Sequence, residues 1–121
     1  MKIYSFEKLD AWKHGKKICI WTYKNTRHYP DEEKFGLTSQ MRRASLSIPS
    51  NLAEGSSRFT NKDKAWFTNI AYSSTLELLN HLIISNELEF LSTQQLEEGR
   101  SLIEKQTLLL SQLRKSQLGD S

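Results

Sequence analysis

Residues 40–58, which read QMRRASLSIPSNLAEGSSR, are the stretch that decides the fold. Apolar or small side chains recur through it at alternating steps of four and three, the spacing of a helix face that packs against neighbouring helices. That face comprises Leu37, Met41, Ala44, Ile48, Asn51 and Gly55. Since the face narrows from large side chains to Asn and Gly, we expect another element to approach closely near its end.

A line of polar side chains runs beside this face, and acid and base stand four apart at Glu54 and Arg58, the favourable order for a helical ion pair. Buried polar groups need partners. We therefore expect an assembly motif, not a ligand site, whose groups pair with each other or across a subunit boundary. Glu54→Ala should then weaken assembly or stability, and Pro49 should bend the helix. The motif comprises Arg43, Ser47, Pro49, Asn51, Glu54, Gly55 and Arg58.

Length and composition favour a single all-helical domain spanning residues 1–121. This length is sufficient for one hydrophobic core, and scarce Gly and Pro with no alternating strand pattern are typical of helical proteins. No apolar run is long enough to cross a bilayer, and the first residues lack the features of a secretory signal. The single cysteine, Cys19, cannot form an internal disulfide, so we expect a cytoplasmic location.

Periodicity and turn signals predict four helices, over residues of about 6–28, 35–57, 61–87 and 92–115. Thr60 and Ser92 stand three residues before Asp63 and Gln95, which is the spacing of a helix N-cap. The tail after residue 115 is expected to fray. Four long helices joined by short connections imply an antiparallel up-down-up-down bundle.

The first and third helices carry more apolar surface than a single bundle needs. The main apolar face of the first helix is expected on Leu9, Trp12, Cys19 and Tyr23. Ala11, Ile18 and Trp21 lie away from this face, either as incidental surface residues or as a second face that contacts another subunit. The third helix is apolar nearly all round, which calls for burial on several sides. We therefore expect an oligomer.

The net charge of +3 is unevenly distributed, because residues 1–29 hold seven Lys and Arg against two Asp and Glu. Uneven charge can mark an anion-binding face, although a solvated lysine face is commoner. No base-reading motif is present, so any RNA or DNA would be bound through its phosphates, independently of sequence. The candidate nucleic-acid-binding residues are Lys13, Lys16, Lys17, Lys24, Arg27, Arg42 and Arg43.

Catalytic and metal chemistry is not expected. Di-iron bundles need two Glu-x-x-His pairs, whereas Glu77 and His81 stand four apart and no second pair exists. Cys19 between two isoleucines is typical of a buried small residue, not of a nucleophile. No glycine-rich phosphate loop or nucleophile elbow is present. We therefore expect no catalytic residue, no metal and no cofactor.

The chain resembles a known family through motifs spread over nearly its whole length. They are Phe6-Glu7-Lys8-Leu9, Trp12, Tyr29-Pro30, Glu33, Gly36-Leu37, Gln40, Arg42-Arg43-Ala44, Ser47-Ile48-Pro49-Ser50-Asn51-Leu52-Ala53-Glu54-Gly55, Arg58, Phe67, Ala71, Ser74, Glu77 and Leu78. The family is the bacterial four-helix-bundle proteins first met as open reading frames in intervening sequences of 23S ribosomal RNA genes. The chain departs from its pattern at Ser73 and Glu89, where glycines are expected.

The resemblance implies a four-helix bundle that assembles into a barrel-like homopentamer with a central channel and has no enzymatic activity. Accessory proteins of diversity-generating retroelements look similar in fold and bind nucleic acid as partners of a reverse transcriptase. We therefore expect a non-enzymatic accessory protein whose partners are its own copies, nucleic acid and a reverse transcriptase, with no membrane contact. The alternatives are a protein-interaction scaffold without nucleic-acid affinity and, more weakly supported, an enzyme with an unrecognised pocket.

Overall fold

The computed structural model describes residues 1–119, and this part of the chain forms four α-helices and no strand. They are α1 (Asp10–Thr26), α2 (Leu37–Ser56), α3 (Asn61–Glu87) and α4 (Thr93–Leu118). Two short 3-10 helices, η1 (Ser5–Lys8) and η2 (Asp31–Glu33), precede α1 and α2. The expected all-α class is therefore confirmed.

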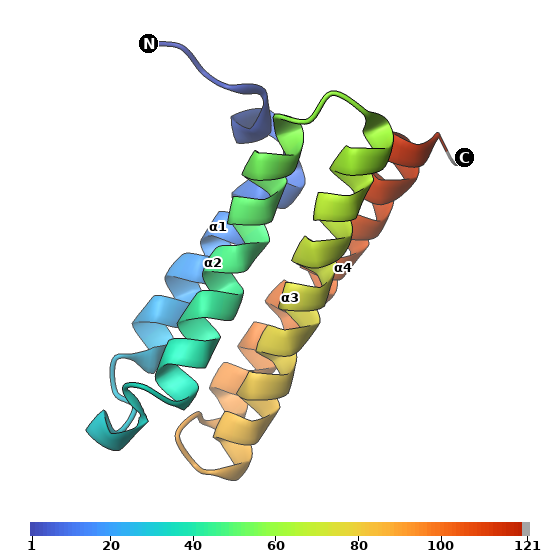
Figure 1. Ribbon diagram of the computed structural model, residues 1–121. Helices are drawn as coiled ribbons and strands as arrows, with labels where there is room; N and C mark the ends of the chain where they lie inside the picture. The colour runs from blue at the N-terminus through green and yellow to red at the C-terminus, as the bar shows by residue number, and fades with distance from the viewer. Residues whose placement is uncertain (120–121) are drawn as a thin grey trace.

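The four helices lie side by side in one elongated unit (Figure 1). The connection between α2 and α3 lies at the same end as η1, whereas the connections between α1 and α2 and between α3 and α4 lie at the other end (Figure 1). Each helix packs against the next one along the chain, and α4 also packs against α1. Side chains from all four helices therefore enclose the core.

The first two helices begin later than the expected residues 6 and 35. Leu9 has an extended backbone (φ −73°, ψ 126°), which separates η1 from α1. At the start of α2, a carboxylate oxygen of Glu33 accepts a hydrogen bond from the Leu37 N–H at 3.1 Å. This contact satisfies one of the donors that a helix start leaves free, so η2 acts as the cap of α2.

The last two helices begin at the predicted N-caps. The Thr60 hydroxyl accepts from the Asp63 N–H at 3.1 Å, and Ser92 and Gln95 bond each other's backbone N–H in a complete capping box. α4 continues beyond residue 115 to Leu118. Residues 120–121, which belong to the tail expected to fray, lie outside the described residues.

The connection from α3 to α4 contains a non-glycine residue with a left-handed backbone. Glu89 has φ 65°, at the position after the C-cap where glycine is usual. Its N–H donates to Asn86 O at 3.0 Å, and the Phe90 N–H donates to Ser85 O at 2.9 Å, so the chain makes a Schellman motif. Glu89 is one of the two positions where the family resemblance leads one to expect glycine, and the positive φ gives the physical reason.

The buried face of α1 differs from the predicted one. Ile18 is 1% exposed, so it is a core residue of the subunit, neither incidental surface nor a contact with another subunit. Ala11 is buried as well, and Trp21 is half-buried against Gly99 of α4. The predicted face of Leu9, Trp12, Cys19 and Tyr23 is only partly buried, and α1 reaches the core through Ala11, His14, Gly15, Ile18, Thr22 and Thr26.

Small and polar residues explain why this face was missed. At Gly15 a Cβ atom would come within 3.0 Å of Ile48 Cγ2 in α2, so the absence of a side chain is what permits the packing. The hydroxyls of Thr22 and Thr26 donate to the Ile18 and Thr22 carbonyl oxygens at 2.8 Å. Threonine that satisfies its hydroxyl within its own helix can be buried at little cost. Hydrophobicity alone therefore selected the wrong side of the helix.

α2 and α3 meet closely where the small face of α2 ends, as expected. Gly55 is buried, and a Cβ atom there would lie 2.7 Å from Phe67 Cβ and 3.6 Å from the Lys64 carbonyl oxygen. The approaching element is therefore the first part of α3. α2 continues through Pro49 to Ser56 as one helix.

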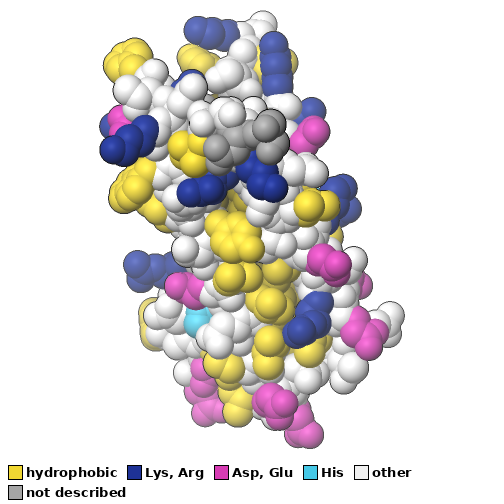
Figure 2. Space-filling model, turned by 90° about the vertical axis from the view of Figure 1, so that its right-hand side faces the viewer, with side chains coloured by type: hydrophobic (Ala, Val, Ile, Leu, Met, Phe, Trp, Pro, Cys, Tyr) yellow, Lys and Arg dark blue, Asp and Glu magenta, His cyan; other side chains and the backbone are white. Residues whose placement is uncertain are grey.

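α3 is apolar on almost every side, and the bundle covers only part of it. Phe67, Ala71, Leu78 and Leu82 enter the core. Trp66, Leu76, Ile83 and Ile84, which we call the outer surface of α3, remain 38–59% exposed. On the side formed by α3 and α4, hydrophobic side chains gather in a stripe that runs along the middle of the molecule (Figure 2). The bundle therefore leaves the outer surface of α3 uncovered.

Candidate nucleic-acid interface

A groove of about 440 Å³ with basic walls lies between α1 and α4. We call it the α1–α4 groove. Three lysines from the two helices line it, two from α1 and one from α4, and Asp10 supplies the one acidic side chain in its lining. The lining residues are Asp10, Lys13, His14, Lys17, Lys105 and Leu109. The helical spacing of Lys13 and Lys17 brings both to one side of α1, and the packing of α4 adds Lys105.

Four hydrogen bonds between side chains of one helix and groups of the other hold α1 against α4. His14 Nε2 lies 2.8 Å from the Leu102 carbonyl oxygen and, since a carbonyl only accepts, is the donor. Gln106 Nε2 donates to the Ala11 carbonyl oxygen at 2.9 Å. The other two are Trp21 Nε1 to Glu98 Oε1 and Gln95 Nε2 to Asn25 Oδ1. These contacts fix the spacing of the two helices and so the width of the groove.

His14 is buried beneath the lysines at the floor of this groove. Burial lowers the pKa of His14 below its ordinary value of 6.5, and the charges of Lys105 and Lys17 lower it further, while the hydrogen bond to Leu102 partly opposes them. The imidazole is therefore neutral at pH 7. Lys13, Lys17 and Lys105 are exposed and present the positive charge.

The other predicted nucleic-acid-binding residues lie at different places. Lys24 is exposed on α1, two turns beyond Lys17 on the same side of the helix. Lys16 stacks over the Trp12 ring, with Nζ 4.8 Å from its centroid. Arg27 is exposed at the C-cap of α1. These three residues do not line the α1–α4 groove.

The two arginines of α2 are also outside the groove. Arg42 is half-buried, donates through Nε to Thr26 Oγ1 at 3.0 Å, and lies 4.7 Å from the Tyr23 ring centroid. These contacts tie α2 to α1 through Nε and the face of the guanidinium. Arg43 is exposed on α2, a helix that does not contribute to the groove. Lys105 was missed because it is 88 residues from Lys17 and nothing in the sequence connects them.

A family model described as the 23S rRNA-intervening sequence protein matches residues 7–112. The match begins within η1 and reaches into the last turns of α4. The chain belongs to this family. A search of curated proteins found no match to the chain. The resemblance inferred from the sequence motifs is therefore confirmed at the level of the family.

Part of the predicted assembly motif forms a polar network between α2 and α3. Asn51 Nδ2 donates to the Ser47 carbonyl oxygen at 2.8 Å and to Ser47 Oγ at 2.9 Å. The Ser47 hydroxyl lies 2.8 Å from the Ser74 hydroxyl of α3. The network thus satisfies polar groups at a helix contact, as the hypothesis of a structural role requires.

The expected ion pair between Glu54 and Arg58 is absent from the described residues. The spacing of four residues favours an ion pair only where both residues lie within one helix, and α2 ends at Ser56. Arg58 therefore lies off the helix, and its guanidinium sits 4.8 Å from the Phe67 ring centroid. Arg43 and Glu54 are exposed and make no ion pair within the part of the chain described. The Glu54→Ala substitution would therefore remove no ion pair within a single subunit.

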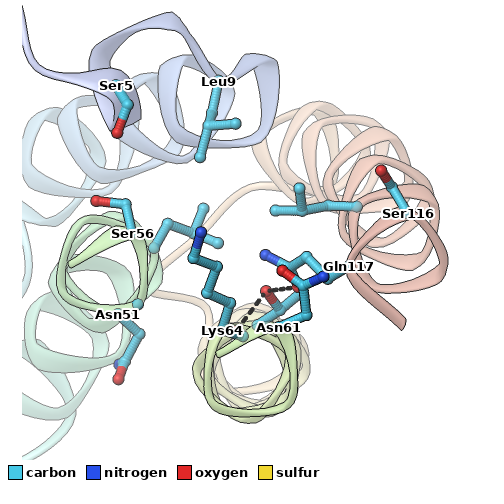
Figure 3. Close-up of a pocket in the computed structure, with 12 residues that line it drawn as sticks. Ser5, Leu9, Asn51, Ser56, Asn61, Lys64, Ser116 and Gln117 are labelled. Atoms are coloured by element: carbon cyan, nitrogen blue, oxygen red, sulfur yellow. Dashed lines mark hydrogen bonds between the residues drawn. The ribbon is translucent and has the colours of Figure 1, made fainter. Parts of the chain in front are cut away.

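A second cavity, of about 290 Å³, lies at the end of the bundle near η1 (Figure 3). Its walls are hydroxyl, amide and leucine side chains, and Lys64 is the one charged residue that lines it. The Thr68 hydroxyl donates to Gln117 Oε1 at 2.8 Å across the α3–α4 contact. A lone lysine without a carboxylate or histidine neighbour in the lining lacks the paired groups of acid–base catalysis, so this cavity is not an evident active site.

Residues 1–119 contain no group of three or more His, Cys, Asp and Glu side chains that is placed to hold a metal ion. Glu77 and His81 approach to 3.6 Å as an isolated pair. Cys19 is half-buried and accepts a long hydrogen bond, 3.7 Å, from Ser45 Oγ. Among the described helices, none combines the length and apolarity needed to cross a bilayer.

Proposed function

We propose that this protein is a non-enzymatic, cytoplasmic accessory factor that binds the phosphate backbone of nucleic acid through the α1–α4 groove. The observation that carries the proposal is the meeting of Lys13 and Lys17 from α1 with Lys105 from α4 at one concave surface. Residues far apart in the sequence gather there into one cationic site. A lysine face formed by chance along one helix would lack the contribution of α4.

The chemistry of the groove suits phosphates and not base edges. Lysine ammonium groups attract phosphate as point charges and demand little geometric precision. Neutral His14 supplies a polar floor without adding charge at pH 7. The lining of the groove holds no Phe, Tyr or Trp for base stacking, and its one aromatic ring, the imidazole of His14, is buried. Recognition should therefore depend on charge and shape and be independent of sequence.

We propose further that the unit is an antiparallel up-down-up-down bundle that assembles into a barrel-like homopentamer. The exposed outer surface of α3 supports assembly, and the family resemblance supports the subunit number. Repetition of a three-lysine groove around a ring would bring several weak phosphate contacts together and raise the avidity. A reverse transcriptase is the partner that the resemblance to retroelement accessory proteins suggests.

Binding of a labelled structured RNA and of a DNA duplex across a salt series tests the proposal. We expect affinity to fall steeply as salt rises, because counterions compete for the same phosphates. The variant Lys13→Ala/Lys17→Ala/Lys105→Ala should bind more weakly and with a shallower salt slope. Loss of three exposed lysines elsewhere, in Lys34→Ala/Lys62→Ala/Lys115→Ala, is the matched control for net charge.

Equal losses in the two triple variants would mean that only total charge matters and would remove the groove from the proposal. No binding at low salt by the wild-type protein would favour the alternative, a scaffold that binds proteins alone. The exposed apolar surface on α3 supports that alternative.

A further inference from the structure

We propose that the outer surface of α3 in one copy of the chain packs against the cleft between α1 and α2 in the next copy. The inference rests on the proposed self-assembly and names the two surfaces that produce it. Both surfaces are exposed in the single chain, and neither is used by the α1–α4 groove. One copy can therefore offer both surfaces to its neighbours, and the complementarity of the two surfaces favours a second copy of this chain as the occupant of each.

The cleft between α1 and α2, which we call the α1–α2 groove, is an apolar depression of about 290 Å³. Ile20 and Leu46 stand at its rim and are 50% and 44% exposed. Between them lie Trp12, Cys19 and Pro49, with Lys16 as the one charged lining residue. Ile20 and Leu46 are exposed to water beside an apolar depression. Such a surface is suited to receive a ridge of apolar side chains.

The outer surface of α3 has the complementary shape and charge. Leu76 and Ile83 are seven residues apart, so they stand two turns apart on one line of the helix, and both are partly exposed at 45% and 38%. From residue 65 to residue 87, α3 carries Glu77 and Glu87 and no Lys or Arg. A ridge on a helix segment with two acidic and no basic side chains would therefore meet a groove whose one charged lining residue is Lys16, which favours this pairing over contact of either surface with itself.

The contact joins two different surfaces, so each copy keeps one of each kind free for a further neighbour. Such head-to-tail contacts generate rings when the rotation between copies closes, and open filaments when it does not. In the bundle, α3 packs against α2 and α4, and α1 and α2 pack against each other. The α1–α4 groove then occurs once per copy and in the same orientation on every copy of a ring.

Two variants that each disable one surface test this arrangement by mass. Ile20→Asp/Leu46→Asp blocks the α1–α2 groove, and Leu76→Asp/Ile83→Asp blocks the α3 surface. In analytical ultracentrifugation without nucleic acid, the wild type should be an oligomer and each variant a monomer. An equimolar mixture should form dimers and nothing larger, because it contains one intact surface of each kind. Far-UV circular dichroism establishes that both variants remain helical.

Phe59→Asp is the matched control, since Phe59 is fully exposed on the α2–α3 connection and belongs to neither surface. It should keep the wild-type mass. A monomeric wild type, a single variant that retains the wild-type mass, or a mixture of folded variants that stays monomeric would each overturn the inference. The groove lysines are untouched in these variants, so the nucleic-acid proposal stands or falls separately in the salt series.

Discussion

The α2–α3 contact and the α1–α4 contact show two ways of holding helices together in one small bundle. α2 and α3 approach through the small residue Gly55, where a Cβ atom would overlap Phe67. α1 and α4 are joined by side-chain hydrogen bonds such as His14 to Leu102, and a basic groove opens beside them. The cavity that Gly55 helps to line at the close contact holds one charged side chain, Lys64, whereas three lysines line the groove beside the hydrogen-bonded contact. The candidate site lies at the second kind of contact.

Gly55→Ala should produce the largest loss of stability of these substitutions, because it places a Cβ atom in the close contact between α2 and α3. In a helix the change normally gains about 1 kcal/mol. Here the new Cβ would meet Phe67 Cβ at 2.7 Å, and overpacking of a rigid contact costs about 1–3 kcal/mol. We expect a net loss of up to about 2 kcal/mol in the free energy of urea unfolding.

The matched control is Gly99→Ala at the other contact. There the new Cβ would meet Leu82 Cδ1 and the far edge of the Trp21 ring, both at 2.8 Å. These atoms belong to the ends of side chains and can move, so the loss should be smaller. A larger loss at Gly99 than at Gly55 would reverse the comparison between the two contacts.

Asn51→Ala should lower the free energy of unfolding by roughly 1–2 kcal/mol, because Asn51 bonds Ser47, the residue of α2 whose hydroxyl meets Ser74 of α3. The change removes the two hydrogen bonds from Asn51 to Ser47, and a typical intramolecular hydrogen bond contributes about 1 kcal/mol. The neighbouring Ser50→Ala, at an exposed position on the same helix, should change the stability by less than about 0.5 kcal/mol. Thermal and urea unfolding of the pair check this, and equal effects would mean that the network contributes nothing.

The extent to which sequence predicted these features follows from how local each signal is. The range of α3 and both N-caps depend on neighbouring residues such as Thr60 and Asp63, and the structure has them where the pattern indicated. The α1 face was misassigned because Gly15 and threonines line it. The ion pair with Arg58 is absent because Arg58 lies beyond the end of α2, where its guanidinium contacts the Phe67 ring of α3.

Sequence predicted only part of the basic groove, because only some of its residues give a local signal. The spacing of Lys13 and Lys17 marks one side of a helix, and both residues line the groove. Lys105 comes from a helix whose partner cannot be read from its own periodicity. Arg42 was grouped with the lysines because it carries the same charge. Its contacts with Thr26 and Tyr23 depend on the packing of α1 on α2, which the sequence does not show.

Glu89→Gly tests a position that belongs to neither contact. Relief of a left-handed backbone at a non-glycine residue should stabilise the fold by about 1 kcal/mol. Since the change lies outside the α1–α4 groove, nucleic-acid affinity at fixed salt should stay the same apart from the loss of one negative charge. Glu89→Gln controls for the charge alone, and a gain in stability as large as that of Glu89→Gly would mean that electrostatics, not backbone strain, is responsible.

His14→Gln should have the smallest effect on stability at pH 7. The pH dependence of stability and of nucleic-acid affinity should show whether His14 acts in the groove. The pKa of His14 is lowered in the folded state, so protonation favours the unfolded chain. Its contribution to stability is therefore present above the ordinary value of about 6.5 and is lost as the pH falls below it. The groups that face the imidazole are Lys17 and Lys105, with Lys13 and Asp10 at the same groove.

A bound phosphate should act on His14 in the opposite direction. The negative charge would raise the pKa of the imidazole, so binding would take up a proton and affinity should increase as the pH falls from 7.5 to 5.5. Glutamine can keep the hydrogen bond to the Leu102 carbonyl oxygen but cannot titrate, so His14→Gln should lose a large part of this increase. Binding of the same RNA at the two pH values and constant ionic strength measures it. If the variant retained the full pH dependence, His14 would have no role in the groove, and the phosphate contacts would lie with the exposed lysines alone.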